Sequence, residues 1–258
     1  MIELGLIGWP LGHSRSPEYF KKKFQELGIE GTYSLFPLGN ILKLPALIAA
    51  HPDLRGLNVT IPYKQSIMAY LKSISQDAIA IGAVNTIVIE QDKGEIRLTG
   101  HNTDFIGFMD SLSPIVNKMS FRDDCKALIL GTGGASKAVA YGLSKLDIPF
   151  VLASRDPKEY MINGSHQKVI GYGDITPELL NRHRIIINCT PLGMWPETEG
   201  CPALPWDALP DNAICYDLVY NPSMTEFMKR GAERGATVKN GLEMLHLQAD
   251  AAWDLWSR

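Results

Sequence analysis

Several features are scarce or missing in this 258-residue sequence. No CxxC pair occurs, and no cysteine stands near histidines at metal-ligand spacing, so we predict reduced, mostly buried thiols and no metal site. No apolar run reaches the roughly 20 residues of a membrane helix, and the N-terminus has no charged region followed by a cleavage site. We therefore expect a cytoplasmic protein. The four cysteines are Cys125, Cys189, Cys201 and Cys215.

The sequence also lacks an excess of charge of either sign. Lys and Arg number 25 and Asp and Glu 28, which gives a formal net charge of -3. This balance leaves no electrostatic footprint for nucleic acid or for an anionic membrane surface, so we expect a small-molecule partner. With 45% hydrophobic residues, the chain can bury the core of one large domain or two small ones. The oligomeric state stays open, with a homodimer as one candidate.

Internal repeats and low-complexity segments are absent, and short apolar runs alternate with amphipathic segments of helical length instead. This alternation predicts a mostly parallel sheet covered by helices. In the first part we expect strands at 3–7, 32–37, 56–61, 84–90 and 96–100, the last two joined by a hairpin turn at 91–95. The expected helices lie at 17–27, 42–50 and 63–71.

The pattern restarts at Cys125, after a predicted helix over 105–112. A strand, a glycine-rich turn and a helix over 125–146 begin this second unit. Further strands are expected at 149–154, 168–171, 185–188, 214–218 and 237–239, followed by a long helix at 241–256. The sequence therefore predicts a two-domain α/β protein. Residues 1–104, completed by 241–258, form one domain, and residues 105–240 form the other.

The segment "LILGTGGASKAV" indicates a dinucleotide site. Gly131, Gly133 and Gly134 follow an apolar strand directly and begin a helix. Glycines permit a tight turn, and the helix N-terminus stabilises a pyrophosphate. The spelling departs from the usual fingerprint, because Ser136 stands at the third glycine position, but the strand-loop-helix context supports the assignment.

The end of the next strand bears on the choice of dinucleotide. Ser154 and Arg155 occupy the turn where an arginine favours the 2'-phosphate of NADP. Asp156 follows directly, and its carboxylate would repel that phosphate if it pointed inward. The sequence favours NADP and leaves NAD open.

Polar side chains gather where the strands of the first domain end. In "GLNVTIPYK", Asn58, Thr60 and Lys64 share one parity, opposite to the apolar residues. Taken singly, Lys64 could be a surface lysine and Asp104 an N-cap. Because the carboxyl ends of strands form the ligand crevice of an open α/β sheet, we expect the whole set to face one site. The other members are Ser14, Ser16, Asn85 and Thr103.

Eight motifs resemble, in order and spacing, those of the shikimate dehydrogenase family, and they cover essentially the whole chain. The resemblance implies a substrate domain, a Rossmann-like NADP domain, and reversible reduction of 3-dehydroshikimate to shikimate with NADPH in aromatic amino acid biosynthesis. The motifs are "IGWPLGHSRSP", "LNVTIPYK", "IGAVNT", "HNTD", "GTGGAS", "INCTPLGM", "DLVYNPSMTEF" and "NGLEMLHLQA".

The same resemblance implies residue roles. Lys64 and Asp104 resemble the family's catalytic pair. The implied substrate-binding residues are Ser14, Ser16 and Tyr220 near the carboxylate and Asn58, Thr60, Asn85 and Gln248 at the ring. The implied cofactor-binding residues are Asp77, Gly131, Thr132, Gly133, Gly134, Ala135, Ser154, Arg155, Thr190, Leu218 and Gly241, with Met194 in a motif lining the cleft.

Two departures from the family pattern leave alternatives open. The usual Asn-Arg-Thr is replaced by Ser154, Arg155 and Asp156, so a quinate/shikimate dehydrogenase that also uses NAD remains an alternative. Phe20 and Lys21 replace a His-Asn pair in a helix expected to serve packing. A catalytically silent dinucleotide-binding paralogue is a further alternative, although it would be expected to lack Lys64 or Asp104.

Overall fold

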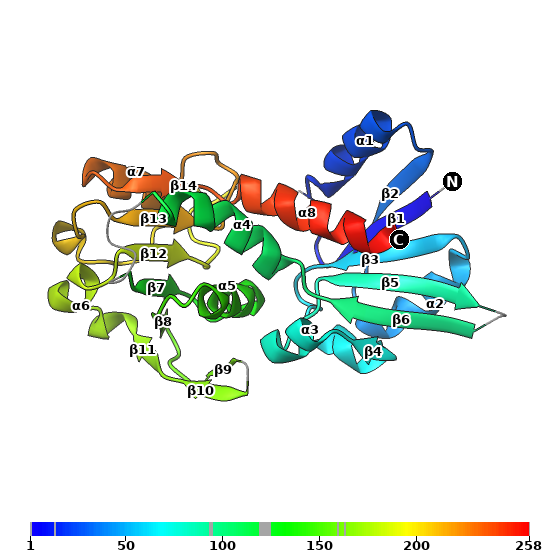
Figure 1. The fold of residues 1–258 in the computed structure, drawn as a ribbon, viewed down its shortest axis with the longest axis horizontal. Coiled ribbons are helices and arrows are strands. Elements are labelled where there is room, and N and C mark those ends of the chain that lie inside the picture. Colours follow the sequence, from blue (N-terminus) through cyan, green and yellow to red (C-terminus); the bar gives the residue numbers. More distant parts are fainter. Residues whose placement is uncertain are drawn as a thin grey trace. The chain divides into compact units, whose positions relative to one another are not determined.

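The computed structural model describes residues 2–12, 14–92, 95–118, 125–158, 160–162 and 164–257. Its chain divides into two compact units (Figure 1). Unit 1 comprises Met1–Thr103 together with Gln248–Arg258, and unit 2 comprises Asp104–Leu247. The sequence placed the two boundaries after 104 and 240, so residues 241–247 are the main difference. Helix α8 (Leu242–Trp256) therefore contributes residues to both units.

Unit 1 contains a six-stranded sheet of order β2-β1-β3-β5-β6-β4. β1 pairs in parallel with β2 and β3, and β4 with β6, whereas β5 is antiparallel to β3 and β6. The expected mostly parallel sheet with one hairpin is confirmed; residues 93–94 of the expected turn lie outside the described residues. The strands are β1 (Ile2–Gly8), β2 (Gly31–Pro37), β3 (Leu54–Val59), β4 (Ser73–Ile74), β5 (Thr86–Asp92) and β6 (Glu95–His101).

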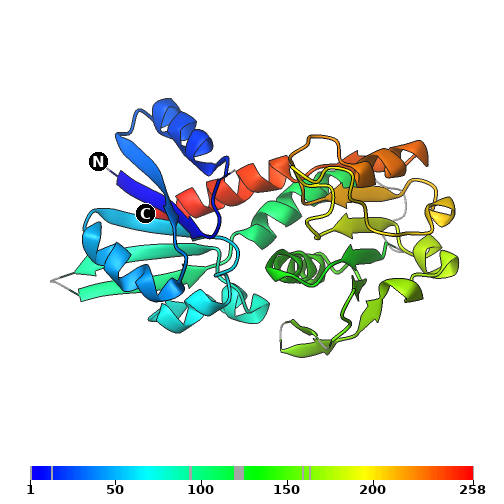
Figure 2. The same ribbon diagram turned by 180° about the vertical axis from the view of Figure 1, so that it is seen from behind.

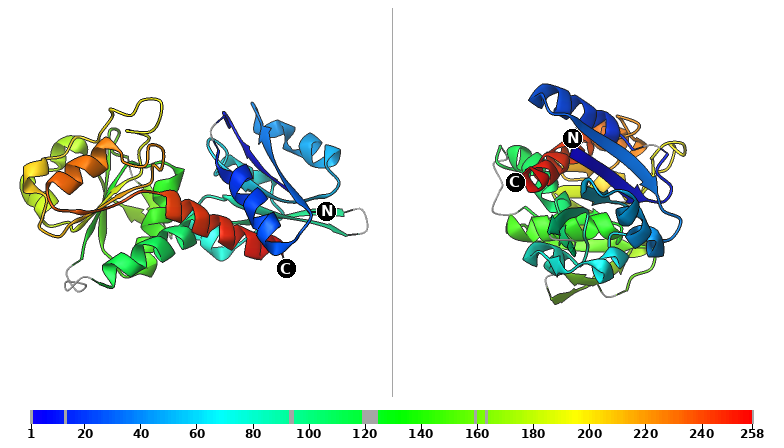
Figure 3. Two further views of the ribbon diagram at one scale, coloured as in Figure 1. Left: turned by 90° about the horizontal axis from the view of Figure 1, so that it is seen from above. Right: turned by 90° about the vertical axis from the view of Figure 1, so that its right-hand side faces the viewer.

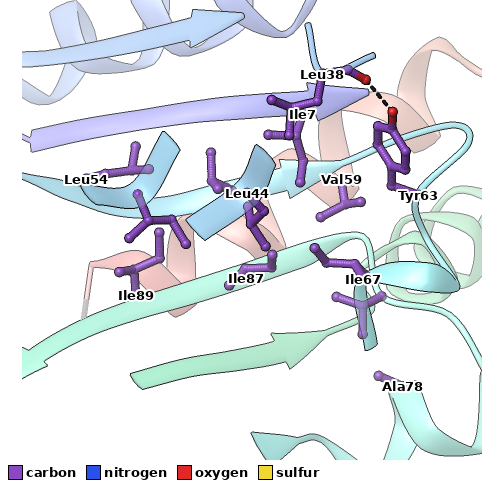
Figure 4. Close-up of a cluster of buried hydrophobic side chains, with 13 residues drawn as sticks. Ile7, Leu38, Leu44, Leu54, Val59, Tyr63, Ile67, Ala78, Ile87 and Ile89 are labelled. Carbon is purple, nitrogen blue, oxygen red and sulfur yellow. Dashed lines mark hydrogen bonds between the residues drawn. The ribbon is translucent and has the colours of Figure 1, made fainter. Parts of the chain in front are cut away.

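Both faces of this sheet are covered. On one face Leu57 and Val59 join a core with α2 (Leu44–Ala50), η2 (Ser66–Tyr70) and α3 (Gln76–Ile81), shown in Figure 4. On the other face α1 (Ser16–Leu27) and the end of α8 pack through Phe20, Phe24 and Trp256; Figure 2 shows these elements from behind. Leu57 and Val59 therefore face the first core, as the alternation predicted, whereas β3 ends before Ile61, which is exposed.

One predicted helix of unit 1 is wrong. Residues 63–71 form the short 3-10 helix η2 over Ser66–Tyr70. The chain then joins the sheet as β4, because the Lys72 backbone N–H donates to the Leu98 carbonyl at 3.0 Å and Ser73 pairs with Thr99 of β6. Strand pairing leaves too few residues for an α-helix. The predicted helix at 42–50 likewise begins as the 3-10 helix η1 (Ile41–Lys43) before α2.

Unit 2 contains a six-stranded sheet in which every pairing is parallel. Its order, β11-β8-β7-β12-β13-β14, is 3-2-1-4-5-6 in chain order, the doubly wound arrangement that the sequence predicted. A small hairpin, β9 (Tyr160–Ile162) with β10 (Ser165–Gln167), was not predicted. The strands of the sheet are β7 (Ala127–Leu130), β8 (Phe150–Ser154), β11 (Val169–Gly171), β12 (Ile185–Asn188), β13 (Ile214–Asp217) and β14 (Thr237–Lys239).

Helices cover both faces of this second sheet (Figure 3). On one face α4 (Asp104–Val116) lies beside α5 (Gly134–Lys145), and Ser111 of α4 bonds the buried Tyr216 hydroxyl at 2.7 Å. On the other, α6 (Pro177–Asn181) and α7 (Glu226–Glu233) pack through Leu180 and Phe227, beside the 3-10 helix η5 (Trp206–Ala208). A further 3-10 turn, η4 (Tyr172–Asp174), precedes α6. Within the described part of the chain, no helix combines the length and apolar character needed to cross a bilayer.

Candidate active site

A network of uncharged polar side chains lies buried in unit 1, beside the carboxyl end of β3. Asn58 and Thr86 are paired across β3 and β5, and the Asn58 amide donates to the Thr86 hydroxyl at 3.2 Å. The Asn85 amide donates to Thr103 Oγ1 at 2.9 Å and to Gln248 Oε1 at 3.3 Å. The Thr103 backbone N–H donates to Asn85 Oδ1 at 2.7 Å. Four segments far apart in sequence therefore meet through neutral groups that can both donate and accept.

Tyr33 extends this network to the first helix. Its hydroxyl donates to Asn58 Oδ1 at 2.7 Å and also hydrogen-bonds with the Ser16 side chain. Burial raises the pKa of Tyr33, so the phenol stays neutral and acts as a donor. Ser16 is the first residue of α1, and its N–H donates to Ser14 Oγ at 3.3 Å. The N-cap of α1 is Arg15 and not Ser16, and no described side chain caps the helix there.

The expected catalytic pair is held by its backbone close to this network. The Lys64 carbonyl accepts from the Val84 N–H at 2.7 Å, next to Asn85. Asp104 is 7% exposed and follows Thr103, whose N–H is bonded to Asn85. The backbone at 64 and the chain leading into 104 are therefore both tied to residues 84 and 85. Thr60, just past β3, donates from its N–H to the Ile7 carbonyl at 2.9 Å.

In unit 2 the glycine turn lies between β7 and α5. Gly131 has φ +103°, a conformation that other residues rarely adopt. Gly133 is the N-cap of α5 without a side-chain cap, and a Cβ added there would meet no atom within 4 Å. Among the described residues, the start of α5 thus has no side-chain cap and the space beside Gly133 is open, which suits an anion site. From the unpredicted hairpin, the Tyr160 hydroxyl donates to the Gly133 carbonyl at 3.0 Å and braces the turn.

The turn after β8 carries both signs of charge. The Ser154 hydroxyl lies 3.1 Å from that of Thr132 and accepts from the Asp156 N–H at 3.3 Å. Arg155 is exposed. The Asp156 carboxylate lies 2.6 Å from Lys158 Nζ, so a cation accompanies the acid that complicated the choice of cofactor.

The loop after β12 lies beside the glycine turn. The Thr190 N–H and hydroxyl donate to Asn188 Oδ1 at 3.0 and 2.6 Å. A Cβ added to Gly131 would lie 3.1 Å from Thr190 Cγ2. At the end of β13, a Cβ added to Gly241 would lie 2.1 Å from the Leu218 carbonyl oxygen, so only glycine fits. These loops surround the point where strand order reverses, between β7 and β12, where doubly wound sheets bind ligands.

Comparison with known proteins agrees with this geometry. Residues 6–87 match the model described as the shikimate dehydrogenase substrate binding domain. A shikimate dehydrogenase (NADP(+)) of Methanococcus maripaludis strain C7 is 38% identical over 98% of this chain and 90% of its own length. The chain belongs to the shikimate dehydrogenase family. The resemblance predicted from the motifs is confirmed.

Solved members of the shikimate dehydrogenase family share the whole fold. One in complex with NADP+ aligns with a TM-score of 0.86 and 33% identity, covering 100% of this chain and 90% of that one. The Thermus thermophilus enzyme, solved with NADP(H) and shikimate, aligns with a TM-score of 0.83 and 30% identity, covering 100% and 94%. The predicted two-domain α/β architecture is therefore that of the family.

Within this family member, two predicted site residues stand apart from their groups. Asp77 lies in the first turn of α3 in unit 1, whereas the other expected cofactor residues belong to unit 2. Tyr220 belongs to unit 2, whereas the other expected substrate residues belong to unit 1. Their roles remain predictions.

The sequence motifs of the family did not lead us to several buried polar residues. Asn188 and Asp217 are the last residues of β12 and β13 and are completely buried. A polar residue closing an apolar strand was the signal that could have found both. Tyr33 carried no such signal, because it lies inside β2, and Thr86 carried none, because it begins β5 instead of closing a strand.

Proposed function

We propose that this chain catalyses the reversible reduction of 3-dehydroshikimate to shikimate with NADPH, a step of aromatic amino acid biosynthesis. The observation that carries the proposal is the buried neutral network of Asn58, Asn85, Thr103 and Gln248 in a member of this family. Amides and hydroxyls donate and accept at the same time, as the hydroxyl groups of a polyhydroxylated ring do. Unit 1 is the substrate domain in this proposal, and unit 2 the cofactor domain.

The substrate carboxylate is assigned to Ser14 and Ser16. Two hydroxyls beside the start of α1 suit an anion, since helix N-termini carry partial positive charge. Thr60, Asn85 and Gln248 are assigned to the ring hydroxyls.

Lys64 and Asp104 are assigned to the chemistry at the carbonyl. Reduction of a ketone builds negative charge on the carbonyl oxygen, and a cation placed there lowers the barrier. Lys64 stabilises and protonates that oxygen, while Asp104 orients the ammonium group and accepts a hydrogen bond from a substrate hydroxyl. NADPH, when bound, supplies the hydride.

The residues of unit 2 fit the dinucleotide. The open space over Gly133 and the uncapped start of α5 suit the pyrophosphate, which is assigned to residues 131–135. Thr190, Leu218 and Gly241 are assigned to the nicotinamide half, and so is Asp77. Ser154 and Arg155 are assigned to the adenosine phosphate.

NADP is preferred over NAD in this proposal because of the charges after β8. Lys158 pairs with Asp156, so the turn carries two cations, Arg155 and Lys158, against one carboxylate. A net positive turn favours the 2'-phosphate that distinguishes NADP.

A spectrophotometric assay tests the proposal. Purified protein is given shikimate or quinate with NADP or NAD, and formation of the reduced cofactor is followed at neutral pH. We expect shikimate with NADP to give a kcat/KM at least about 10-fold above every other combination, a difference of about 1.4 kcal/mol. Comparable rates with quinate and NAD would favour the broader quinate/shikimate enzyme. Dinucleotide binding without turnover would favour the silent paralogue.

A further inference from the structure

Three hydrogen-bond donors of unit 2, one at the end of β12 and two in the loop after β13, converge on one buried carboxylate, that of Asp217. Asp217 is the last residue of β13 and is completely buried. Its Oδ1 accepts from the Asn188 side-chain amide at 3.0 Å and from the Val219 N–H at 2.9 Å. Its Oδ2 accepts from the Thr225 hydroxyl at 2.6 Å. A side chain held by three donors has one orientation, and the groups that hold it are fixed in return.

The hydrogen bond between Asn188 and Asp217 also fixes the loop after β12. While the Asn188 amide donates to Asp217, its oxygen accepts from the N–H and the hydroxyl of Thr190. Thr190 in turn lies beside Gly131 of the glycine turn. Asp217 therefore reaches the dinucleotide turn through two successive side chains.

The other two bonds fix the loop after β13. The Val219 N–H belongs to the peptide that follows Leu218, whose carbonyl is packed against Gly241. Thr225 is the N-cap of α7, accepting from the Met228 N–H at 3.3 Å. The Thr225 side chain also closes on the first loop, because a Cβ added to Gly193 would lie 3.4 Å from Thr225 Cβ.

We propose that Asp217 is a positioning residue for the cofactor site, setting the loops at 189–194 and 218–225 in the arrangement that the nicotinamide half of the dinucleotide requires. Asp217 does not touch the ligand in this proposal; it acts through Asn188, Val219 and Thr225. The inference rests on the proposed function of unit 2 as the NADP domain.

A pair of threonines provides a matched test. Thr225 and Thr176 are both helix N-caps, and each accepts from a backbone N–H, at 3.3 and 3.2 Å. Only Thr225 also donates to a buried carboxylate. Thr225→Ala and Thr176→Ala therefore lose similar capping stability, about 1 kcal/mol, but only Thr225→Ala loosens the Asp217 cluster.

The measurement is the Kd for NADPH, from the change in NADPH fluorescence on binding, together with KM for NADP and for shikimate. We expect Thr225→Ala to raise Kd and KM for the cofactor about 5-fold and Asp217→Ala about 10-fold or more, with KM for shikimate within about 2-fold of wild type. Asp217→Asn keeps acceptor Oδ1 and two of the three bonds, so its Kd is expected within about 3-fold of wild type.

Two results would overturn the proposal. One is an unchanged cofactor Kd in Thr225→Ala and Asp217→Ala; the other is an equal rise in Thr176→Ala, which marks a general loss of stability. If Asp217→Ala does not fold, the threonine pair decides alone. A wild-type protein that binds NADPH without oxidising shikimate would refute the proposed function, while the cofactor Kd values still judge Asp217.

Discussion

The two units arrange their strand ends in different ways. In unit 1 the ends of β3 and β5 present neutral side chains that bond one another, from Asn58 across to Gln248. In unit 2 the end of β7 exposes backbone groups, because glycines follow it and no side chain caps the N-cap of α5. The neighbouring loop after β13 is hydrogen-bonded to the buried Asp217 carboxylate. The candidate site of unit 1 is therefore built from side chains, whereas that of unit 2 is built from backbone groups at glycines that leave space for a ligand.

This difference determines how each unit should respond to change. A network of neutral side chains is sensitive to removal of a single donor or acceptor, because the partner is left buried and unsatisfied. A backbone site is sensitive to an added Cβ instead. The buried Asp217 carboxylate, whose pKa is raised, should also make the stability of unit 2 respond to pH, whereas the side chains of the unit 1 network are neutral.

The largest expected effect lies in unit 1. Lys64→Ala removes the proposed cation at the carbonyl, and kcat for shikimate oxidation is expected to fall about 100-fold or more, the usual range for a general acid-base group. Lys72→Ala is the control, since Lys72 is exposed and lies 3.9 Å from Glu95 at the surface. Unchanged turnover in Lys64→Ala would remove Lys64 from the mechanism.

The second-largest expected effect is a pH dependence of the free energy of unfolding that arises from Asp217 in unit 2. Burial raises the pKa of Asp217 from 3.8 to about 6, so the folded state holds this proton more tightly than the unfolded state does. The contribution of Asp217 to stability is therefore fully present below the unfolded pKa and is lost as pH rises through the folded pKa. Relative to Asp217→Asn, which does not titrate, wild type should lose about 2 kcal/mol between pH 4.5 and pH 7.

Urea unfolding of both proteins at several pH values measures this difference. Three thiols near Asp217 have raised pKa values and stay neutral across this range, so they should add no slope. A constant gap between the two proteins from pH 4.5 to pH 7 would contradict the prediction. The three thiols are Cys189, Cys201 and Cys215.

An added methyl group tests the backbone site of unit 2. Gly131→Ala places a Cβ at φ +103° and 3.1 Å from Thr190, so KM for NADP is expected to rise about 10-fold. Gly235→Ala is the matched control. Gly235 also has positive φ, +79°, but a Cβ there would meet no atom of the described residues within 4 Å. Both variants should lose stability; an equal rise of KM in both would mean that strain alone, and not the turn, disturbs the cofactor.

Much of the fold could be predicted because its signals are local. A few consecutive residues were enough to predict several elements, namely the apolar strands β7, β12 and β13 and the glycine turn after β7. The prediction of a helix at 63–71 was wrong because the structure there depends on a contact distant in sequence. The helical pattern is overridden by pairing of Ser73 with Thr99, a contact that no local pattern contains.

The candidate site was only partly predictable for the same reason. Asn58 and Asn85 stood out because polar residues interrupt apolar strands at a crevice edge. The bond from Tyr33 to Asn58 depends on β2 and β3 flanking β1 in the sheet, which follows from strand order and not from spacing. The role of Asp217 likewise depends on β12 and β13 being neighbours.

A smaller effect is expected at the start of α1. Ser14→Ala and Ser16→Ala each remove one hydroxyl from the proposed carboxylate site, which a net bond energy of about 1 kcal/mol converts to about a 5-fold rise in KM for shikimate. Because a remote carboxylate is bound equally in the ground and transition states, kcat should be preserved. Ser73→Ala, at the exposed edge beside Thr99, is the control. A loss confined to kcat would contradict the assignment.

The smallest effect is the coupling between Tyr33 and Asn58, which tests whether the network of unit 1 is one structure. Tyr33→Phe leaves Asn58 Oδ1 without its 2.7 Å donor, and Asn58→Leu leaves the phenol without its acceptor. The double variant removes both, so unfolding free energies should be non-additive by about 1 kcal/mol. Tyr63→Phe with Asn58→Leu is the control pair, because Tyr63 belongs to the core on the opposite face and donates to the Leu38 carbonyl instead. Additivity in both pairs would mean that the polar side chains of unit 1 act singly, and the contrast between the two units would then rest on unit 2 alone.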